Sequence, residues 1–525
     1  MLTPRLKSMA QITTIVLGAA LLLGACGDDG DNPQGPEVNN GVNNDDGNND
    51  DGNDQNNDLN NAPNNDEPNN DQNNDAPNNE VDDNLEERIA NATITELTFI
   101  PPAQQRSGDP EAGFDALRYG NFVGSGLPYE TFTMFFGTSP NNLLMREGDN
   151  ATLSPAFNAF DAPNGARVVG GITCFGCHSG GLDGRYVLGL GDNSANTTES
   201  RGGFNLLQTL VESQYGADSP EAEMSGIFLR GAAAVEPFAI TPFRGVNSAF
   251  RLEEAAAAWR NPVDLSWREE PAFEVGGDGL ASDVPPWWNV KKKHSLYYNG
   301  MGRGDFARLI QQIMVVGLVD LEQAEDINSQ AGDMLAWILE VEPPAWPNEI
   351  NEELAAEGQD LFERECSRCH GTYGPEGNYP NLLVPLAMVG TDEAYARYYV
   401  EKPGLTNWYE ESWFAQDTSV EPLLAYLAPP LDGIWASAPY FHNASVPTLM
   451  DVLDSTRRPT YWLRDFTTSA IDKEAVGIPY EAVDAGGDIN IYDTTVHGYG
   501  NGGHTFGDAF SDEERQAVLE YLKTL

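Results

Sequence analysis

Two short cysteine and histidine motifs constrain this chain more than any other feature. They read C-x-x-C-H and consist of Cys174, Cys177 and His178 in the first copy and Cys366, Cys369 and His370 in the second. Two cysteines three positions apart lie on one helical turn, so both thiols can add to one porphyrin while the adjoining histidine binds its iron. One copy alone could be half of a zinc site or a redox dithiol. Two complete copies predict two covalently bound haem c groups, with His178 and His370 as iron ligands.

The fifth cysteine, Cys26, follows a segment with the pattern of a secretory signal. A short basic region precedes an apolar stretch at 15–23, and small residues lead into Cys26. This order resembles the lipobox of bacterial lipoproteins, although an ordinary signal peptide with an incidental cysteine is the alternative. We expect a signal peptide at 1–25, a lipid on Cys26, and a lipid-anchored protein in the periplasm or on the cell surface, the outer membrane being favoured. Export agrees with the motifs, because c-type haem is attached outside the cytoplasm.

The segment at 26–87 is dominated by Asn, Asp, Gly and Pro, and residues 1–98 contain no Phe, Trp or Tyr. Such a segment cannot repay the entropy of ordering itself, so we expect a disordered acidic tether. Much of the formal net charge of -52 comes from this tether. Nucleic acid is excluded as a partner, because phosphate binding needs clustered Lys and Arg. The basic run at 291–293 is interpreted as a solvated face or a clamp for haem propionates.

Apolar spacing in the second half predicts a cytochrome c-like domain. The spacing at 353–362 indicates a helix that leads into the second motif. Ser511 and Glu514 form the pattern of a capping box, which predicts a terminal helix that packs across the first one. The Pro-rich stretch at 342–347 breaks the preceding helix and forms a linker.

The predicted fold class is therefore mainly α, with two cytochrome c-like haem domains, at 88–347 and 348–525, that contain long loops. The first domain is harder to interpret. Helical periodicity occurs at 204–211 and 306–318, and glycine-rich turns are expected on both sides of the first motif. Few strands are expected, and no internal repeat is evident beyond the two haem motifs.

The motifs and four further segments resemble the superfamily of bacterial di-haem cytochrome c peroxidases and MauG. Within it, the resemblance is greater to the rubber oxygenase RoxA and its relatives. The four segments are Ala438 to Leu449, Pro285 to Lys293, Gly300 to Asp305, and Gly502 to Gly507. The resemblance implies that chemistry occurs at the haem on His178 and that the haem on His370 relays electrons. It also raises the possibility of a Ca²⁺ ion between the domains.

The resemblance further suggests ligands and neighbours for the second haem. His504 matches the distal histidine near the carboxyl terminus of the rubber oxygenase group, and Met388 and Met450 are the alternatives, since a thioether also binds haem iron. His442 belongs to the most recognisable segment, where the matching histidine lies near a haem without binding it. Direct ligation by His442 is the alternative.

Three residues are candidates for the neighbourhood of the first haem. Trp287 and Trp288 either carry electrons between the haems or pack in the core. His294 either reaches the distal side of the first haem or is a surface histidine beside the three lysines. The last histidine, His497, gives no signal of its own.

Three functions remain open at this point. The first is an oxidoreductase that acts on peroxide or oxygen, a peroxidase or a RoxA-like oxygenase; the sequence places no distal acid or base securely, which weakens the peroxidase interpretation. The second is a pure electron-transfer cytochrome with two six-coordinate haems, and the third is a surface module with structural haems. The expected partners are a redox protein or a small-molecule electron donor or acceptor, and a membrane reached through the lipid.

Overall fold

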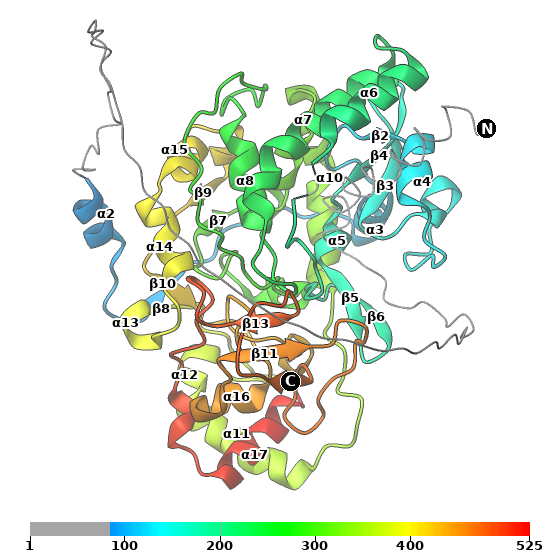
Figure 1. The fold of residues 1–525 in the computed structure, drawn as a ribbon. Helices are drawn as coiled ribbons and strands as arrows, with labels where there is room; N and C mark the ends of the chain where they lie inside the picture. Colours follow the sequence, from blue (N-terminus) through cyan, green and yellow to red (C-terminus); the bar gives the residue numbers. More distant parts are fainter. Residues whose placement is uncertain (1–83, 201) are drawn as a thin grey trace, which may run out of the picture.

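The computed structural model describes residues 84–200 and 202–525 and is mostly helical, with short strands between the helices (Figure 1). The predicted signal peptide, Cys26 and nearly all of the predicted tether lie outside the described residues. No helix in the described ranges is long and apolar enough to cross a membrane.

The helices and strands alternate irregularly along the chain. The helices are α2 (Leu85–Ala92), α3 (Pro110–Tyr119), α4 (Tyr129–Phe136), α5 (Cys174–Cys177), α6 (Phe204–Tyr215), α7 (Pro220–Ala239), α8 (Ala249–Ala258), α9 (Phe306–Leu309), α10 (Leu321–Glu340), α11 (Glu352–Glu365), α12 (Ser367–His370), α13 (Leu386–Val389), α14 (Ala394–Glu401), α15 (Gly404–Glu410), α16 (Leu449–Leu453) and α17 (Asp512–Leu522). The strands are β1 (Thr98–Phe99), β2 (Leu127–Pro128), β3 (Phe157–Asp161), β4 (Arg167–Gly171), β5 (Ser179–Leu182), β6 (Arg185–Leu188), β7 (Gly302–Gly304), β8 (Leu382–Pro385), β9 (Thr418–Val420), β10 (Ala425–Leu427), β11 (Tyr461–Arg464), β12 (Tyr480–Ala482) and β13 (Ile491–Asp493).

Three predicted helices are confirmed, and a fourth is confirmed only in part. Helices α11, α17 and α6 cover the predicted segments, and α10 ends before the Pro-rich stretch. The segment at 306–318 is instead divided into α9 and a 3-10 helix at Gln312–Val316. The buried guanidinium of Arg260 donates to the carbonyl oxygens of Val315 and Leu318. Those carbonyls therefore point to a side chain, and the regular helix does not continue through them.

The terminal helix α17 packs against α11, as the sequence predicted. Its capping box is present: the Ser511 side chain accepts from the Glu514 amide, and the Glu514 carboxylate accepts from the Ser511 amide. The two helices cross so closely at Gly358 that an added Cβ would collide with the backbone carbonyl of Ala517. This crossing supports the second C-x-x-C-H motif, which begins where α11 ends.

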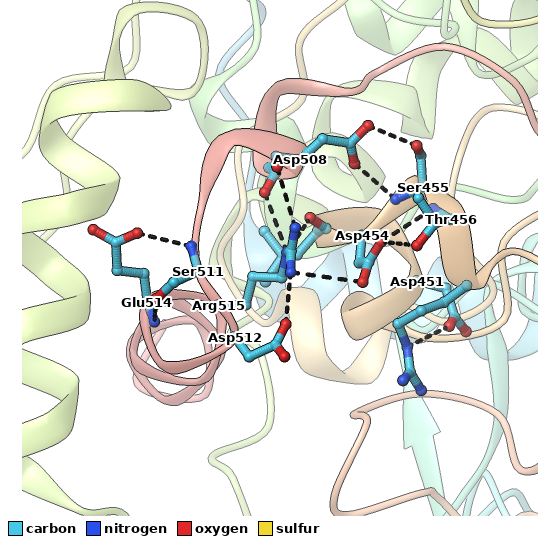
Figure 2. Close-up of polar contacts among 12 residues, drawn as sticks. Asp451, Asp454, Ser455, Thr456, Asp508, Ser511, Asp512, Glu514 and Arg515 are labelled. Carbon is cyan, nitrogen blue, oxygen red and sulfur yellow. Dashed lines mark hydrogen bonds and ion pairs between the residues drawn. The ribbon is translucent and has the colours of Figure 1, made fainter.

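One arginine ties α17 to the segment around α16 (Figure 2). The Arg515 guanidinium lies 2.8 Å from the carboxylate of Asp512 and 3.6 Å from that of Asp454. It also donates to the backbone carbonyl of Asp508, whose carboxylate accepts from the Ser455 hydroxyl at 2.6 Å. The start of α17 is thus fixed through side chains as well as through its cap.

The glycine-rich segments beside the first motif are strands, so the prediction of turns there was wrong. Strand β4 is the central strand of the sheet β2-β4-β3 and the last of the three along the chain, and it precedes α5. Strand β5 follows α5 and pairs with β6. At Gly170 of β4, the ring of Phe160 from the neighbouring strand occupies the space that a Cβ would need, so this position favours glycine. The first motif therefore sits on one helical turn between two strands, unlike the second.

Elements on both sides of the predicted boundary at 347/348 contact each other. Strand β1 pairs with β8, β7 pairs with β9, and α15 packs against α8. One apolar core contains residues from both segments. The domain boundaries stay a prediction.

The predicted tether ends earlier than residue 87. Helix α2 begins at Leu85, and its Arg88 side chain donates to the backbone carbonyls of Val400 and Glu401 at the end of α14. Ile89 adds an apolar contact to the small cluster that contains Val400. Helix α2 thus lies beside α14 rather than with the nearest elements in sequence (Figure 1).

Replacing Gly358 by Val should separate α11 from α17. We expect the thermal unfolding midpoint of the purified holoprotein to drop by several degrees, because overpacking a tight crossing costs about 1–3 kcal/mol. Gly277→Val is the matched control, since a Cβ there meets no atom within 4 Å. Circular dichroism measures both variants, and equal midpoints would contradict the crossing.

Candidate haem sites

The second motif lies at the junction of α11 and α12. The Nδ1 atom of His370 is 2.9 Å from the carbonyl oxygen of Pro429. Because a carbonyl only accepts, Nδ1 carries the proton and Nε2 keeps its lone pair. This tautomer is the one that an imidazole needs to bind iron through Nε2.

The structure brings His504 to the ring of His370. The two ring centroids are 6.2 Å apart, with an interplanar angle of 61°. Two imidazoles bound to one metal through bonds of about 2 Å place their ring centres about 6 Å apart. The pair therefore fits the two faces of one haem iron. Phe441 and Phe506 contact the His504 ring at 5.8 and 5.1 Å.

The two methionines considered as alternative ligands lie differently. Met388 is on α13 with 41% of its surface exposed, and Met450 is in the core at 7% exposure. The backbone amide of His504 donates to Val389, the residue next to Met388. Among the described residues, His504 is the candidate for which a contact with the His370 ring is observed. Ligation by His504 stays a prediction.

The first motif places His178 at the end of α5. The backbone amide of Asp192 donates to the carbonyl of Cys177, and the Asn247 side chain donates to the Cys177 sulfur at 3.7 Å. The His178 ring stacks on Trp287 at 4.8 Å with an interplanar angle of 21°. None of the four motif cysteines forms a disulfide, so all four thiols are available for thioether links.

Burial keeps the imidazoles at both motifs neutral. It lowers the pKa of His178 to about 4 and also lowers the pKa of His370. Burial lowers the pKa of His504 to about 3 as well. A neutral imidazole has the free lone pair that binding to haem iron requires.

The structure reveals an internal repeat that the sequence analysis missed. Residues 285–301 align without a gap with residues 429–445, so each residue corresponds to the one 144 positions later. Both segments begin with Pro-Pro, and both close an antiparallel bridge, Leu296 with Gly302 and Tyr440 with Val446. The statement that no repeat exists beyond the motifs was therefore wrong.

The backbone of the two copies has the same unusual conformation. Tyr297 and Phe441 have φ values of 67° and 71°, and Gly300 and Ala444 have values of 62° and 60°. A positive φ is uncommon for side chains of this size, so the agreement reflects a shared turn.

Each copy begins with a proline whose carbonyl lies beside a motif histidine. Pro429 accepts from His370, and the carbonyl of Pro285 opposes the decrease that burial causes in the pKa of His178. The repeat thus places a proline loop beside the motif histidine in each half, and in the second half this loop holds the ring by a hydrogen bond.

The repeat makes Tyr298 the counterpart of His442. The His442 ring is 5% exposed and stacks on Tyr426 at 4.1 Å. Its Nε2 is 3.1 Å from the Tyr426 hydroxyl, which donates to the carbonyl of Asp392. Burial lowers the pKa of His442 to about 3, so the ring is neutral. Its contacts describe a residue held beside the second site by tyrosines.

The predicted candidates near the first haem separate in space. Trp287 packs against His178, whereas Trp288 is fully buried and its Nε1 donates to the carbonyl of Asp432 at 2.8 Å. His294 points elsewhere: its Nδ1 is 2.7 Å from the carbonyl of Ile100. His497 is exposed.

The three lysines of the basic run differ in their surroundings, and their role as a solvated face or as a clamp for haem propionates stays a prediction. Lys291 pairs with Glu342, and Lys292 pairs with Asp432. Desolvation lowers the pKa of Lys293 to about 8, and its charge helps to lower the pKa of His178. Lys293 is therefore the lysine of the run whose charge acts on the first motif.

A buried acid also escaped the sequence analysis. Asp283 is 9% exposed and accepts from the Tyr298 hydroxyl at 2.6 Å. The repeat could have identified Tyr298, because this residue occupies the position of His442, whereas Asp283 lies before the repeat and carries no such signal. Among the described residues, no group of three or more His, Cys, Asp or Glu side chains could hold a metal ion, so nothing there supports a Ca²⁺ site of that kind.

Comparison with known proteins adds a family to this geometry. Residues 425–463 match the model of the RoxA-like, cytochrome c-like family. Over these residues the chain is similar to that family. The matched segment contains the second copy of the proline loop, and a cytochrome c-like domain implies haem c.

Two relatives are known only as uncharacterized proteins of Sinorhizobium fredii. Protein y4iJ is 28% identical over an alignment of 251 residues that covers 35% of this chain and 41% of y4iJ. Protein y4iM is 23% identical over an alignment of 317 residues that covers 50% of this chain and 69% of y4iM. The chain thus spans less than half of the first relative.

A solved structure of hydrazine synthase from Kuenenia stuttgartiensis matches 57% of this chain and 88% of its own, at 16% identity and a TM-score of 0.23. A likeness at that score does not define the fold of this chain.

Serine substitutions should remove the haems one at a time. We expect Cys174→Ser with Cys177→Ser, and separately Cys366→Ser with Cys369→Ser, each to remove about half of the covalent Soret absorbance. Each pair holds one porphyrin by thioether links. Denaturing electrophoresis with haem staining and intact mass measure the result. Cys26→Ser is the control that keeps both haems, and an unchanged haem content in either double variant would refute that site.

Proposed function

We propose that this chain is an exported, lipid-anchored di-haem c-type cytochrome with oxidoreductase activity. Bound haem would supply redox chemistry at both sites, with peroxide or oxygen reacting at the first site and electrons passing through the second. The redox partner is a protein or a small-molecule donor or acceptor. The RoxA-like family match and the paired motifs support the class of protein.

The asymmetry between the two motif histidines carries this proposal. His370 faces a second imidazole at 6.2 Å, whereas the ring against His178 is the indole of Trp287. The chain has six histidines, and all of them lie in the described ranges. His294, His442 and His497 have other surroundings, so no histidine ring contact with His178 is found among the described residues. This difference favours a closed second site and an open first site.

The residues between the motifs offer a short connection for electrons. Trp287 stacks on His178, and its neighbour Trp288 donates to the carbonyl of Asp432. Asp432 lies three residues after Pro429, whose carbonyl holds the Nδ1 proton of His370. The path from His178 to His370 thus consists of one stacked contact, two hydrogen bonds, and the chain segments that link Trp287 to Trp288 and Pro429 to Asp432. We propose that electrons follow this connection.

Polar groups near the first motif bear on the choice of reaction. Lys293 and the Tyr298–Asp283 pair can hold or release protons, which peroxide cleavage requires. They favour a peroxide reaction over an oxygenase that needs a purely apolar pocket. The second candidate, a pure electron carrier, predicts instead that both sites are closed.

Carbon monoxide separates these functions. We expect the reduced protein to bind one CO per chain, and the oxidised protein to give one high-spin and one low-spin ferric signal in electron paramagnetic resonance. Two low-spin haems that refuse CO would overturn the proposal in favour of the electron carrier. Absorbance titration and resonance spectra of the purified holoprotein measure both properties.

Removing the second imidazole should open the second site. His504→Ala should raise CO binding from one to two per chain, because alanine offers no lone pair to the iron. His497→Ala is the matched control and should leave the stoichiometry at one. If His504→Ala still binds a single CO, His504 is not the ligand.

Trp288→Phe should slow electron exchange between the sites. The variant loses the bond to the carbonyl of Asp432 and should be destabilised by about 1 kcal/mol. Flash photolysis of CO from the half-reduced protein measures the exchange rate. Trp408→Phe is the control, because it loses a similar buried bond to the carbonyl of Arg260. Equal exchange rates in the two variants would contradict the route.

A further inference from the structure

A tyrosine and a carboxylate are held together between the two halves of the molecule. The Tyr298 hydroxyl donates to Oδ2 of Asp283 at 2.6 Å. The backbone fixes both residues: the Asp283 amide donates to the carbonyl of His442, and the Leu427 amide donates to the carbonyl of Tyr298. The Tyr298 phenol is therefore held within hydrogen-bond distance of an anchored carboxyl group.

The pair lies between the first site and the aromatic residues of the second. Asp283 precedes Pro285 by two residues, and the carbonyl of Pro285 acts on His178. On the other side, the Tyr298 ring centroid is 6.5 Å from that of His442, which stacks on Tyr426. Tyr298 therefore stands where its counterpart His442 stands in the second half, but it offers an oxidisable phenol in place of an imidazole.

We infer that Tyr298 and Asp283 form a redox-active pair. In this role the Tyr298 phenol would give one electron to the oxidant that the peroxide reaction produces at the first site. The phenolic O–H bond breaks, and a new O–H bond forms on the Asp283 carboxylate. An electron from the redox partner later reduces the tyrosyl radical, and the proton returns. The inference rests on the proposed function in one respect: the peroxide reaction is the source of the oxidant that removes the electron from Tyr298.

Other buried tyrosines have less suitable partners. Tyr398 donates to Glu254, but Glu254 also forms an ion pair with Arg251, and the cation disfavours protonation of that carboxylate. Tyr499 donates to the backbone carbonyl of Gly279, which cannot take up a proton at neutral pH.

Tyr297, the neighbour of Tyr298, also donates to a carboxylate, that of Glu253, but this contact is 3.5 Å long. Tyr298 is thus distinguished by its shorter hydrogen bond, 2.6 Å, to the buried carboxylate of Asp283.

The protonation state of Asp283 sets when the pair can act. Burial raises the pKa of Asp283 to about 8, the hydrogen bond from Tyr298 opposes the increase, and the nearby Asp192 adds to it. Tyr440 and Tyr492 are the other titratable groups that interact with it. Below that pH the carboxyl is already protonated and cannot accept. The radical yield should therefore rise as pH increases through about 8.

The test is electron paramagnetic resonance of the holoprotein frozen after mixing with hydrogen peroxide. We expect a tyrosyl radical in the wild type, none in Tyr298→Phe, and a roughly 10²-fold slower formation in Asp283→Asn, the loss typical when a general base is removed. Tyr499→Phe is the matched control and should keep the signal. Asp283→Asn should also lose the rise in yield with pH. Soret spectra and thermal unfolding establish that each variant is folded and loaded with haem.

The Soret change on mixing reports the peroxide reaction separately. If peroxide alters the Soret band but no radical forms, or if the radical persists in Tyr298→Phe, the inference is wrong. If peroxide leaves the Soret band unchanged, the proposed peroxide reaction fails. Flash-quench oxidation by a ruthenium photosensitiser then supplies the oxidant, and the same comparison of variants decides whether Tyr298 is the site of oxidation.

Discussion

The structure depends on a hydrogen bond between a motif histidine and the carbonyl of a proline. In the second half, Pro429 accepts from Nδ1 of His370, which fixes the ring plane and leaves Nε2 for the iron. Proline suits this position because it has no amide hydrogen and its fixed φ directs the chain. The helix that leads into this motif, α11, packs on α17, whose start is fixed by its capping box and by Arg515.

The same loop occurs twice, but the surroundings of the two copies differ. The second motif follows the long helix α11, while the first is a single turn between β4 and β5. Helix α11 packs on α17 and supports the second motif, and His504, whose amide donates to the carbonyl of Val389, lies against His370. The first site is built from strands and aromatic rings, with Trp287 against His178. The two sites share the proline loop but differ in the ring that faces the motif histidine. This difference would allow one site to react with substrate and the other to supply electrons.

The interleaving of the halves explains how the sites can communicate. Strand pairs such as β1 with β8 and β7 with β9 join distant parts of the chain, and a single apolar core runs through both. Trp288, Asp283 and Tyr298 lie in this shared region, where each contacts a residue from beyond position 347. Such contacts are fixed by packing, so the geometry between the sites does not depend on a flexible linker.

The sequence by itself determined the local chemistry. Three features depend only on neighbours within one or two helical turns: the C-x-x-C-H spacing, the capping box at Ser511 and the apolar period of α11. The sequence alone therefore predicts them. The repeat escaped notice because its two copies share few identical residues, although positive φ values at Tyr297 and Phe441 show the same turn.

Only the tertiary structure decided which distant residues meet. The pairing of His504 with His370, the stacking of Trp287 on His178 and the bond from Tyr298 to Asp283 join residues that no local pattern connects, and they form because one shared core closes around both halves.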